Sequence, residues 1–139
     1  VQRLISMGLP AYLVAAATRL VIAQRLVRAL CPSCKVAGTL TDEEAALLQP
    51  QEVQALKSVC RPVGCPECKG IGHVGRRVVM EALPVLSSAS RMAVAKGASP
   101  DEIQLLAVKE GMAPMRQQAL QLVADGTISA EEALTVLHV

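Results

Sequence analysis

The cysteines are the residues of this sequence with the clearest chemistry. Four of the five form two C-x-x-C pairs, Cys31 with Cys34 and Cys65 with Cys68. Each pair can hold its two sulfurs about 3.5–4 Å apart, the edge of a tetrahedron with Zn–S bonds of ~2.3 Å. Two pairs supply four thiolates and leave no open position for an activated water. The spacing therefore predicts a structural zinc site at Cys31, Cys34, Cys65 and Cys68.

The long segment between the two pairs, residues 35–64, does not argue against this site. Doubling the length of a loop costs only about 0.6 kcal/mol, whereas a structural zinc ion contributes on the order of 10 kcal/mol. Two disulfides, a redox pair and iron–sulfur ligation are the alternatives. A chain without a secretory signal disfavours disulfides, and the missing βαβ context disfavours redox chemistry. The cysteine count alone leaves iron–sulfur ligation open.

Other residues near the pairs have weaker claims to a role at the metal. Cys60 lies outside the C-x-x-C spacing and is expected to be a buried free thiol. His73 follows Cys68 by five residues in a glycine-rich turn, and is a minor alternative ligand. The basic residues at positions 25, 28, 76 and 77 either offset the negative charge of a zinc–tetrathiolate or form a solvated basic face, and both interpretations stay open.

The composition limits the class of protein. The hydrophobic fraction of 52% comes almost entirely from aliphatic residues, and Tyr12 is the only aromatic residue, which favours a helix-rich core. The formal charge of +2 falls close to zero once an ion with four thiolates is counted, so a nucleic-acid partner is not expected. No apolar run reaches the ~20 residues of a membrane span. The first residue is Val1, and we interpret the chain as a fragment of a longer protein.

The sequence predicts some, but not all, of the helices and strands on either side of the first cysteine pair. We expect a helix over Ala11–Thr18, whereas periodicity does not decide between helix and strand for residues 20–29. Thr41 with Glu44 forms a capping box that predicts a helix through Leu48. A second helix is expected over Gln51–Val59, with apolar residues at helical spacing.

The second half of the chain has a simpler pattern. A β-favouring run, Arg76–Leu83, predicts one strand that stops at Pro84. Two capping boxes, Ser99 with Glu102 and Ser129 with Glu132, and glycines at the expected helix ends then predict four helices near 87–96, 100–110, 114–125 and 129–137. The expected fold is mainly α with a little β.

Several strings of this sequence together resemble the traffic ATPases of bacterial type II secretion and type IV pilus assembly. One string, A-Q-R-L-V-R-A-L-C-P-S-C-K, runs from Ala23 to Lys35. The others are Met7-Gly8, Gly64-Cys65-Pro66-Glu67-Cys68, Gly72-His73-Val74-Gly75-Arg76, Glu81, Gly97-Ala98-Ser99 and Glu110-Gly111-Met112. They occur in order over nearly the whole chain.

This resemblance implies a cytoplasmic, homohexameric motor that is docked at the inner membrane on a platform protein. It assigns residues 1–30 to the end of a RecA-like ATPase domain, residues 31–77 to a tetracysteine zinc-binding module and residues 78–139 to a C-terminal helical subdomain or bundle. It also favours a strand for residues 21–28. No direct membrane insertion is expected.

The catalytic machinery is expected to lie elsewhere in the parent protein. No G-x-x-x-x-G-K-[ST] phosphate loop occurs in these residues, so we expect no catalytic and no cofactor-binding residues other than the metal ligands. ATP and magnesium then bind upstream, and the fragment is not itself an enzyme.

Two other functions compete with this interpretation. The stretch Cys65–Gly72 fits the C-x-x-C-x-G-x-G knuckle of Hsp40 cochaperones, but those proteins repeat it four times. A zinc-ribbon module that binds protein or nucleic acid needs a basic surface and aromatic side chains for stacking. The single Tyr of this chain argues against that function.

Overall fold

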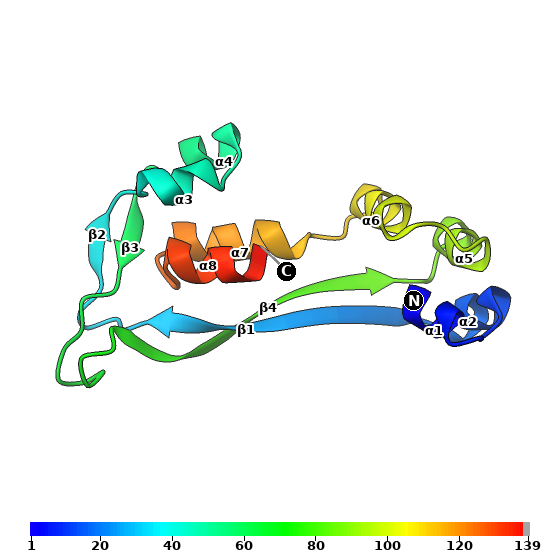
Figure 1. Cartoon of the computed structure of the whole chain (residues 1–139), viewed down its shortest axis with the longest axis horizontal. Coiled ribbons are helices and arrows are strands. Elements are labelled where there is room, and N and C mark those ends of the chain that lie inside the picture. Colours follow the sequence, from blue (N-terminus) through cyan, green and yellow to red (C-terminus); the bar gives the residue numbers. More distant parts are fainter. Residues whose placement is uncertain (138–139) are drawn as a thin grey trace. The chain divides into compact units, whose positions relative to one another are not determined.

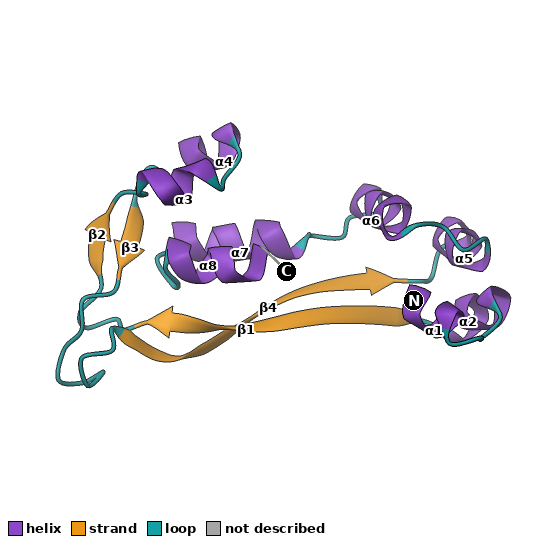
Figure 2. Ribbon diagram, viewed as in Figure 1, coloured by secondary structure: helices purple, strands orange, loops and turns teal. Residues whose placement is uncertain are grey.

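Eight helices and four strands lie along residues 1–137, the part of the chain that the computed structural model describes (Figure 1). The chain is therefore an α/β protein, and helix predominates over strand (Figure 2). None of the described helices is long and apolar enough to cross a membrane.

Two compact units divide the chain, and each combines two separate segments. Unit 1 consists of Val1–Ala23 and Met80–Pro114, and unit 2 of Gln24–Val79 and Met115–Val139. The predicted domain limits at residues 30 and 77 concern the architecture of a parent protein and stay a prediction. Residues 138 and 139 of the predicted last subdomain lie outside the described residues.

Unit 1 is built mainly from four helices. They are α1 (Gln2–Ser6), α2 (Ala11–Ala17), α5 (Ser88–Ala95) and α6 (Pro100–Lys109). Helix α5 packs against both α2 and α6, and the buried side chains of this unit are Val14, Ala15, Val85, Val94 and Ile103. The Ser99 hydroxyl and the Glu102 carboxylate form the expected capping box. The helices predicted over 11–18, 87–96 and 100–110 are confirmed.

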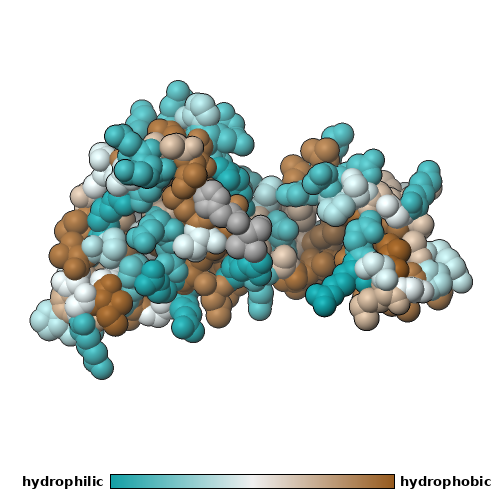
Figure 3. Space-filling model, viewed as in Figure 1, coloured by the Kyte–Doolittle hydropathy of each residue, from teal (hydrophilic) through white to brown (hydrophobic). Residues whose placement is uncertain are grey.

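Many apolar side chains of unit 1 do not contribute to its core. Met7 and Tyr12 are 72% and 65% exposed, and Leu4, Leu9 and Leu13 are exposed as well. Figure 3 shows such hydrophobic residues, in brown, at the surface among hydrophilic ones. The hydrophobic fraction of the sequence therefore overstates the size of the core.

Two long strands pair with each other and contribute residues to both units. They are β1 (Leu20–Leu30) and β4 (His73–Pro84), so the segment that periodicity left undecided is a strand, as the resemblance implied. Strand β4 begins three residues before the predicted start at Arg76. At its start the Cys31 N–H donates to the Gly72 carbonyl oxygen at 2.9 Å, which extends the pairing of β1 with β4 to the first cysteine pair.

Unit 2 also contains a short two-stranded sheet and four helices. The elements are β2 (Val36–Gly38), α3 (Asp42–Ala46), α4 (Pro50–Ala55), β3 (Val59–Arg61), α7 (Met115–Ala124) and α8 (Ala130–Leu137). Strands β2 and β3 are antiparallel, with Ala37 opposite Cys60. The capping box of Thr41 with Glu44 is confirmed, as are the helices predicted near 114–125 and 129–137.

The prediction of one helix over Gln51–Val59 is wrong. Helix α4 ends at Ala55, and Leu56 already has a non-helical ψ of 50°. Val59 is buried in β3, where it lies opposite Gly38. The apolar spacing was compatible with a helix, but Val59 buries its side chain through strand pairing instead.

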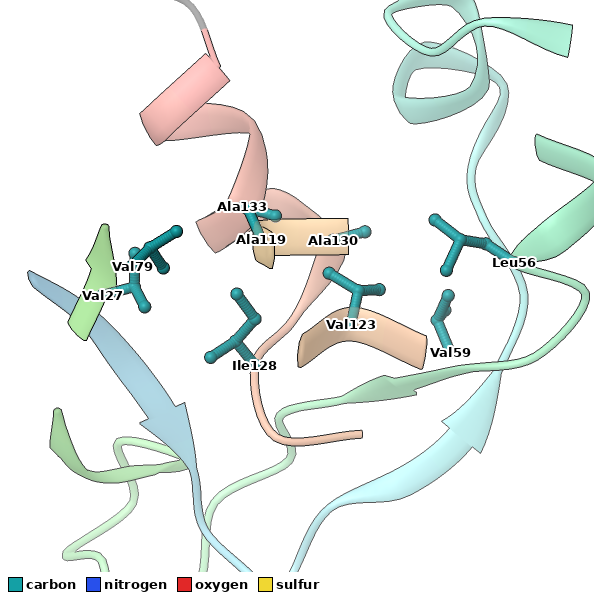
Figure 4. Packing of buried hydrophobic residues seen from close by; sticks show 9 residues of the cluster. All are labelled: Val27, Leu56, Val59, Val79, Ala119, Val123, Ile128, Ala130 and Ala133. Carbon is teal, nitrogen blue, oxygen red and sulfur yellow. The ribbon is translucent and has the colours of Figure 1, made fainter. Parts of the chain in front are cut away.

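The core of unit 2 is where strands and helices meet (Figure 4). Its buried members are Val27, Leu56, Val59, Val79, Ala119, Val123, Ile128, Ala130 and Ala133. The valines come from β1, β3, β4 and α7, and the alanines come from α7 and α8. Because these alanines are small, α7 and α8 can pack closely on each other.

Three arginine–glutamate pairs join elements of unit 2. Arg61 binds both carboxylate oxygens of Glu44 at 2.6 Å, which links β3 to α3. A second pair, Arg116 with Glu52, links α7 to α4 at 2.7 Å. Bidentate geometry makes such pairs stronger than ordinary surface ion pairs.

In the third pair, Glu132 binds Arg28 and does not complete the predicted capping box with Ser129. The Ser129 hydroxyl accepts the Glu132 N–H at 3.2 Å, as a helix cap does. The Glu132 carboxylate, however, accepts the backbone N–H and the Nε–H of Arg28, both at 2.8 Å. Burial raises the pKa of Glu132, but these hydrogen bonds outweigh burial, so its pKa lies below the ordinary value.

Replacing Glu132 by glutamine is expected to lower the free energy of unfolding by about 2 kcal/mol at pH 7, because charge-assisted hydrogen bonds to Arg28 are lost. A carboxyl with a depressed folded-state pKa stabilises above its unfolded pKa, and this contribution disappears as the pH falls through the folded pKa. Urea denaturation at several pH values should show the difference from wild type shrinking below about pH 4.5.

The matched control is Glu131→Gln on the exposed side of α8, which we expect to change stability by less than about 0.5 kcal/mol. An equal loss in both variants, or a Glu132→Gln deficit that is undiminished at pH 3, would contradict the assignment. Each variant is compared with wild type at the same pH. Because all of them carry the same cysteine site, its acid sensitivity cancels in the difference in unfolding free energy.

Candidate metal centre

The sulfurs of the two C-x-x-C pairs converge on one point in unit 2. The Sγ atoms of Cys31 and Cys65 lie 3.8 Å apart, and those of Cys34 and Cys68 are also 3.8 Å apart. The Sγ atoms of Cys65 and Cys68 are separated by 3.7 Å, and all four sulfurs lie within 4.8 Å of one another. The separations of 3.7 and 3.8 Å match the edge of a tetrahedron around one ion with bonds of ~2.3 Å. The group can therefore hold a single metal ion.

This spacing also bears on the kind of metal group. An iron–sulfur cluster distributes its cysteine ligands over several iron atoms, which holds their sulfurs farther apart than a single ion does. The four sulfurs of this chain share one small shell instead. Thiolate ligands in a tetrahedral set are typical of zinc.

Each cysteine pair lies in a tight turn. At the first pair, the N–H groups of Cys34 and Lys35 donate to the Cys31 carbonyl oxygen at 3.4 and 3.0 Å. At the second pair, the Gly70 N–H donates to the Cys65 carbonyl oxygen at 2.9 Å. A proline follows the first cysteine of each pair and fixes the backbone φ of the turn.

Backbone N–H groups also point at two of the sulfurs. Cys34 Sγ accepts the Gly64 N–H at 3.3 Å, and Cys68 Sγ accepts those of Cys65 and Gly72 at 3.1 and 3.2 Å. Burial raises the pKa of Cys68, but its two N–H donors outweigh burial and lower the pKa to about 6. Burial raises the pKa of Cys34 to about 11, against the opposing effect of Gly64. The donors favour the thiolate form that a metal requires.

Two glycines make this geometry possible. Gly64 has a φ of +105°, and a Cβ at this position would lie 2.5 Å from the Gly70 carbonyl oxygen. At Gly72, with a φ of +75°, a Cβ would lie 2.7 Å from the Cβ of Pro62. Both positions thus need a residue without a side chain, and both supply an N–H to a sulfur.

Contacts outside the sulfur shell hold the two turns in place. The Ser33 hydroxyl donates to the Glu67 carboxylate and so joins the two turns. On the other side, the Leu30 N–H donates to the Thr127 carbonyl oxygen at 2.9 Å, and Lys35 Nζ donates to the Gly126 carbonyl oxygen at 2.7 Å. The first cysteine pair is therefore anchored to the turn between α7 and α8.

The structure brings together all four predicted ligands and leaves the other candidates outside. Cys60 is a half-buried free thiol packed on Gly126, where a Cβ would lie 2.7 Å from its sulfur. His73 Nδ1 lies 3.2 Å from the Ile71 carbonyl oxygen. Its Nε2 is buried and has no hydrogen-bond partner within residues 1–137. Neither residue belongs to the sulfur group.

The basic residues beside the cysteine pairs do not act as a set. Arg28 is held by Glu132, so its charge is already compensated within unit 2. The side chains at positions 25, 76 and 77 are exposed on their strands. This arrangement favours the solvated basic face over a role in balancing the charge of a metal centre.

Sequence reasoning missed the residues that support the sulfurs. Two of these residues, Gly64 and Gly72, donate backbone N–H groups to sulfurs and allow close approach of the backbone. The third, Lys35, makes a long-range hydrogen bond. The glycines that flank the second C-x-x-C pair are the signal that could have found two of them, because such positions often require a positive φ. The contact of Lys35 with Gly126 has no counterpart in local sequence.

The fold and the site define an α/β protein with a candidate four-cysteine metal centre. Similarity to known proteins shows its family. Residues 1–135 match the family described as "Type II/IV secretion system protein". The chain belongs to this family, and the resemblance seen in the sequence is confirmed.

Several curated relatives are identical to the chain at about a third of the aligned positions. The type IV pilus assembly ATPase PilB of Myxococcus xanthus is 33% identical over 95% of this chain and 24% of its own length. The type II secretion system protein E of Aeromonas hydrophila is 33% identical over 98% of the chain and 26% of its own length. PilB of Pseudomonas aeruginosa is 35% identical over 94% and 23%. The chain thus spans about a quarter of the length of these relatives.

Proposed function

We propose that this chain is the zinc-stabilised carboxy-terminal part of a hexameric motor ATPase of type II secretion or type IV pilus assembly. One observation carries the proposal: four cysteine sulfurs lie within 4.8 Å of one another in a chain that aligns over 95% of its length with a type IV pilus assembly ATPase. A chaperone-type zinc knuckle would account for a short local match, and not for similarity over the whole chain.

Zinc is the metal that suits these ligands. Cys31, Cys34, Cys65 and Cys68 would hold the ion as four thiolates, and the ion would supply a cross-link with no catalytic position. Since the sulfurs come from two segments separated by residues 35–64, the cross-link fixes the strands β2 and β3 and the helices α3 and α4 that lie between them. The role of the ion is therefore structural.

The fragment itself performs no hydrolysis in this proposal. Its 139 residues contain no phosphate loop, so ATP and magnesium bind upstream in the parent protein. Residues 1–30 form the end of the RecA-like domain, and residues 78–139 form the helical subdomain or bundle. The zinc module between them stiffens the junction, so that nucleotide-driven motion is transmitted as rigid-body rotation.

The parent would work in the cytoplasm, peripheral to the inner membrane. Its partners would be the other subunits of the homohexamer and the inner-membrane platform protein of the secretion or pilus machine. The support for these partners is the family membership of the chain.

Sequencing the gene upstream of Val1 tests the motor assignment. We expect a phosphate loop within the preceding few hundred codons, and ATP hydrolysis by the full-length protein in the presence of magnesium. The isolated 139-residue chain, assayed at the same concentration, should show no activity above buffer. A parent gene without a phosphate loop, or hydrolysis by the isolated chain, would overturn the assignment.

A further inference from the structure

The four cysteine ligands differ in how far solvent can reach them. Cys31 and Cys68 are 1% and 4% exposed, so their sulfurs are shielded by the rest of unit 2. Cys34 and Cys65 are only half-buried. A reagent that approaches the closed site from solvent therefore meets the sulfurs of Cys34 and Cys65 first.

Hydrogen bonding separates these two accessible sulfurs. Cys34 Sγ accepts the Gly64 N–H at 3.3 Å. For Cys65 Sγ, the structure of residues 1–137 shows no N–H donor, and its partners are the sulfurs of Cys31 and Cys68 at 3.8 and 3.7 Å. A hydrogen bond to a thiolate stabilises its charge and makes the sulfur a weaker nucleophile. Among the four ligands, Cys65 alone is reachable from solvent and accepts no N–H hydrogen bond within residues 1–137.

We propose that Cys65 is a modification site of the metal centre, at which electrophiles and peroxides attack first and open the zinc shell. The proposal rests on the proposed function, because it concerns the zinc-loaded chain. Attack by iodoacetamide forms an S–C bond as the C–I bond breaks and iodide leaves. The resulting thioether is neutral and much weaker as a zinc ligand than the thiolate.

Peroxide attack follows the same course with a change of oxidation state. The Cys65 sulfur gives two electrons to hydrogen peroxide, an S–O bond forms, the O–O bond breaks and hydroxide leaves. The product is protonated to the sulfenic acid beside two further sulfurs, and either of these, as a thiolate, can displace hydroxide from it to form a disulfide. Zinc then loses two of its four ligands, and a thiol reductant can restore them.

The test maps the order of modification in the folded, zinc-loaded chain. We would use the Cys60→Ser variant, which removes the half-buried free thiol that competes for reagent. After the zinc content has been measured, one equivalent of iodoacetamide is added, and tandem mass spectrometry assigns the modified cysteine at successive times. A chromogenic chelator follows zinc release in parallel.

We expect Cys65 to react about tenfold faster than Cys34, the effect of about one charge-assisted hydrogen bond, and zinc release to follow Cys65 modification. Cys34 is the internal control, because it is also half-buried. With hydrogen peroxide, dimedone should trap the sulfenate at Cys65.

Equal or faster reaction at Cys31, Cys34 or Cys68 would overturn the proposal, as would modification of Cys65 without zinc release. A chain that is folded but holds no zinc would overturn the proposed function as well, so the two failures are distinguishable. The same mapping on the unmodified sequence, restricted to the four ligand positions, decides the question if Cys60→Ser folds poorly.

Discussion

Replacing Cys68 by serine is expected to abolish zinc binding and to unfold much of unit 2. Cys68 is buried, accepts two backbone N–H groups and contacts the sulfurs of Cys34 and Cys65. Structural zinc contributes on the order of 10 kcal/mol to folding in small domains. We expect a loss of about 5 kcal/mol or more, which corresponds to a fall of roughly 15 °C in the melting temperature.

Elemental analysis and thermal denaturation check this result. Wild-type protein purified without added metal should contain about one zinc per chain, and the variant should contain none. The matched control is Cys60→Ser, the same exchange at a cysteine outside the sulfur group, which should keep its zinc and lose less than about 1 kcal/mol. A strong chelator should destabilise wild type to the level of Cys68→Ser and leave that variant unchanged.

Full retention of zinc and stability in Cys68→Ser would contradict the structural role of the ion.

In the full-length parent, the same variant tests the proposed coupling role. Under the proposed function we expect impaired hexamer assembly there, because the proposed zinc module would no longer stiffen the junction between the proposed RecA-like domain and helical subdomain. Normal assembly and ATP hydrolysis would leave zinc as a local stabiliser only.

The four candidate ligands were predictable because the C-x-x-C spacing is a local signal. A C-x-x-C turn places its own two sulfurs at the right separation, and only the meeting of Cys31–Cys34 with Cys65–Cys68 needs the fold. Helix limits were predictable for a similar reason, since the caps at Thr41 and Ser99 act within one turn. Strand β1 was settled by its pairing with β4, which periodicity within residues 20–29 does not encode.

The elements that were missed depend on partners far along the chain. Strands β2 and β3 have three residues each, too few for an alternating pattern to be recognised. The carboxylate of Glu132 was expected to cap its own helix, but it binds Arg28 at the opposite end of unit 2's sequence. Lys35 likewise finds the Gly126 carbonyl oxygen. Such pairings follow from packing, and one sequence does not reveal them.

Among the glycines, Gly64 is the position at which a single methyl group should do the most damage. Its φ of +105° is unfavourable for any other residue, and a Cβ would meet the backbone oxygen of Gly70 at 2.5 Å. Gly70 cannot easily retreat, because its N–H is bonded to the Cys65 carbonyl oxygen. A shift of Gly64 instead would withdraw its N–H from Cys34 Sγ. Close backbone approach and metal coordination are thus coupled at one residue.

Gly64→Ala is therefore expected to lower the free energy of unfolding by about 3 kcal/mol or more and to weaken zinc binding roughly 10- to 100-fold. The control is Gly70→Ala, whose φ of +80° carries the same left-handed strain but whose Cβ would meet nothing within 4 Å. That strain alone amounts to about 1–2 kcal/mol. Urea denaturation and competition with a zinc chelator measure both variants. Equal losses would show that the backbone angle alone matters, whereas a larger loss at Gly64 assigns the difference to the contact that supports Cys34.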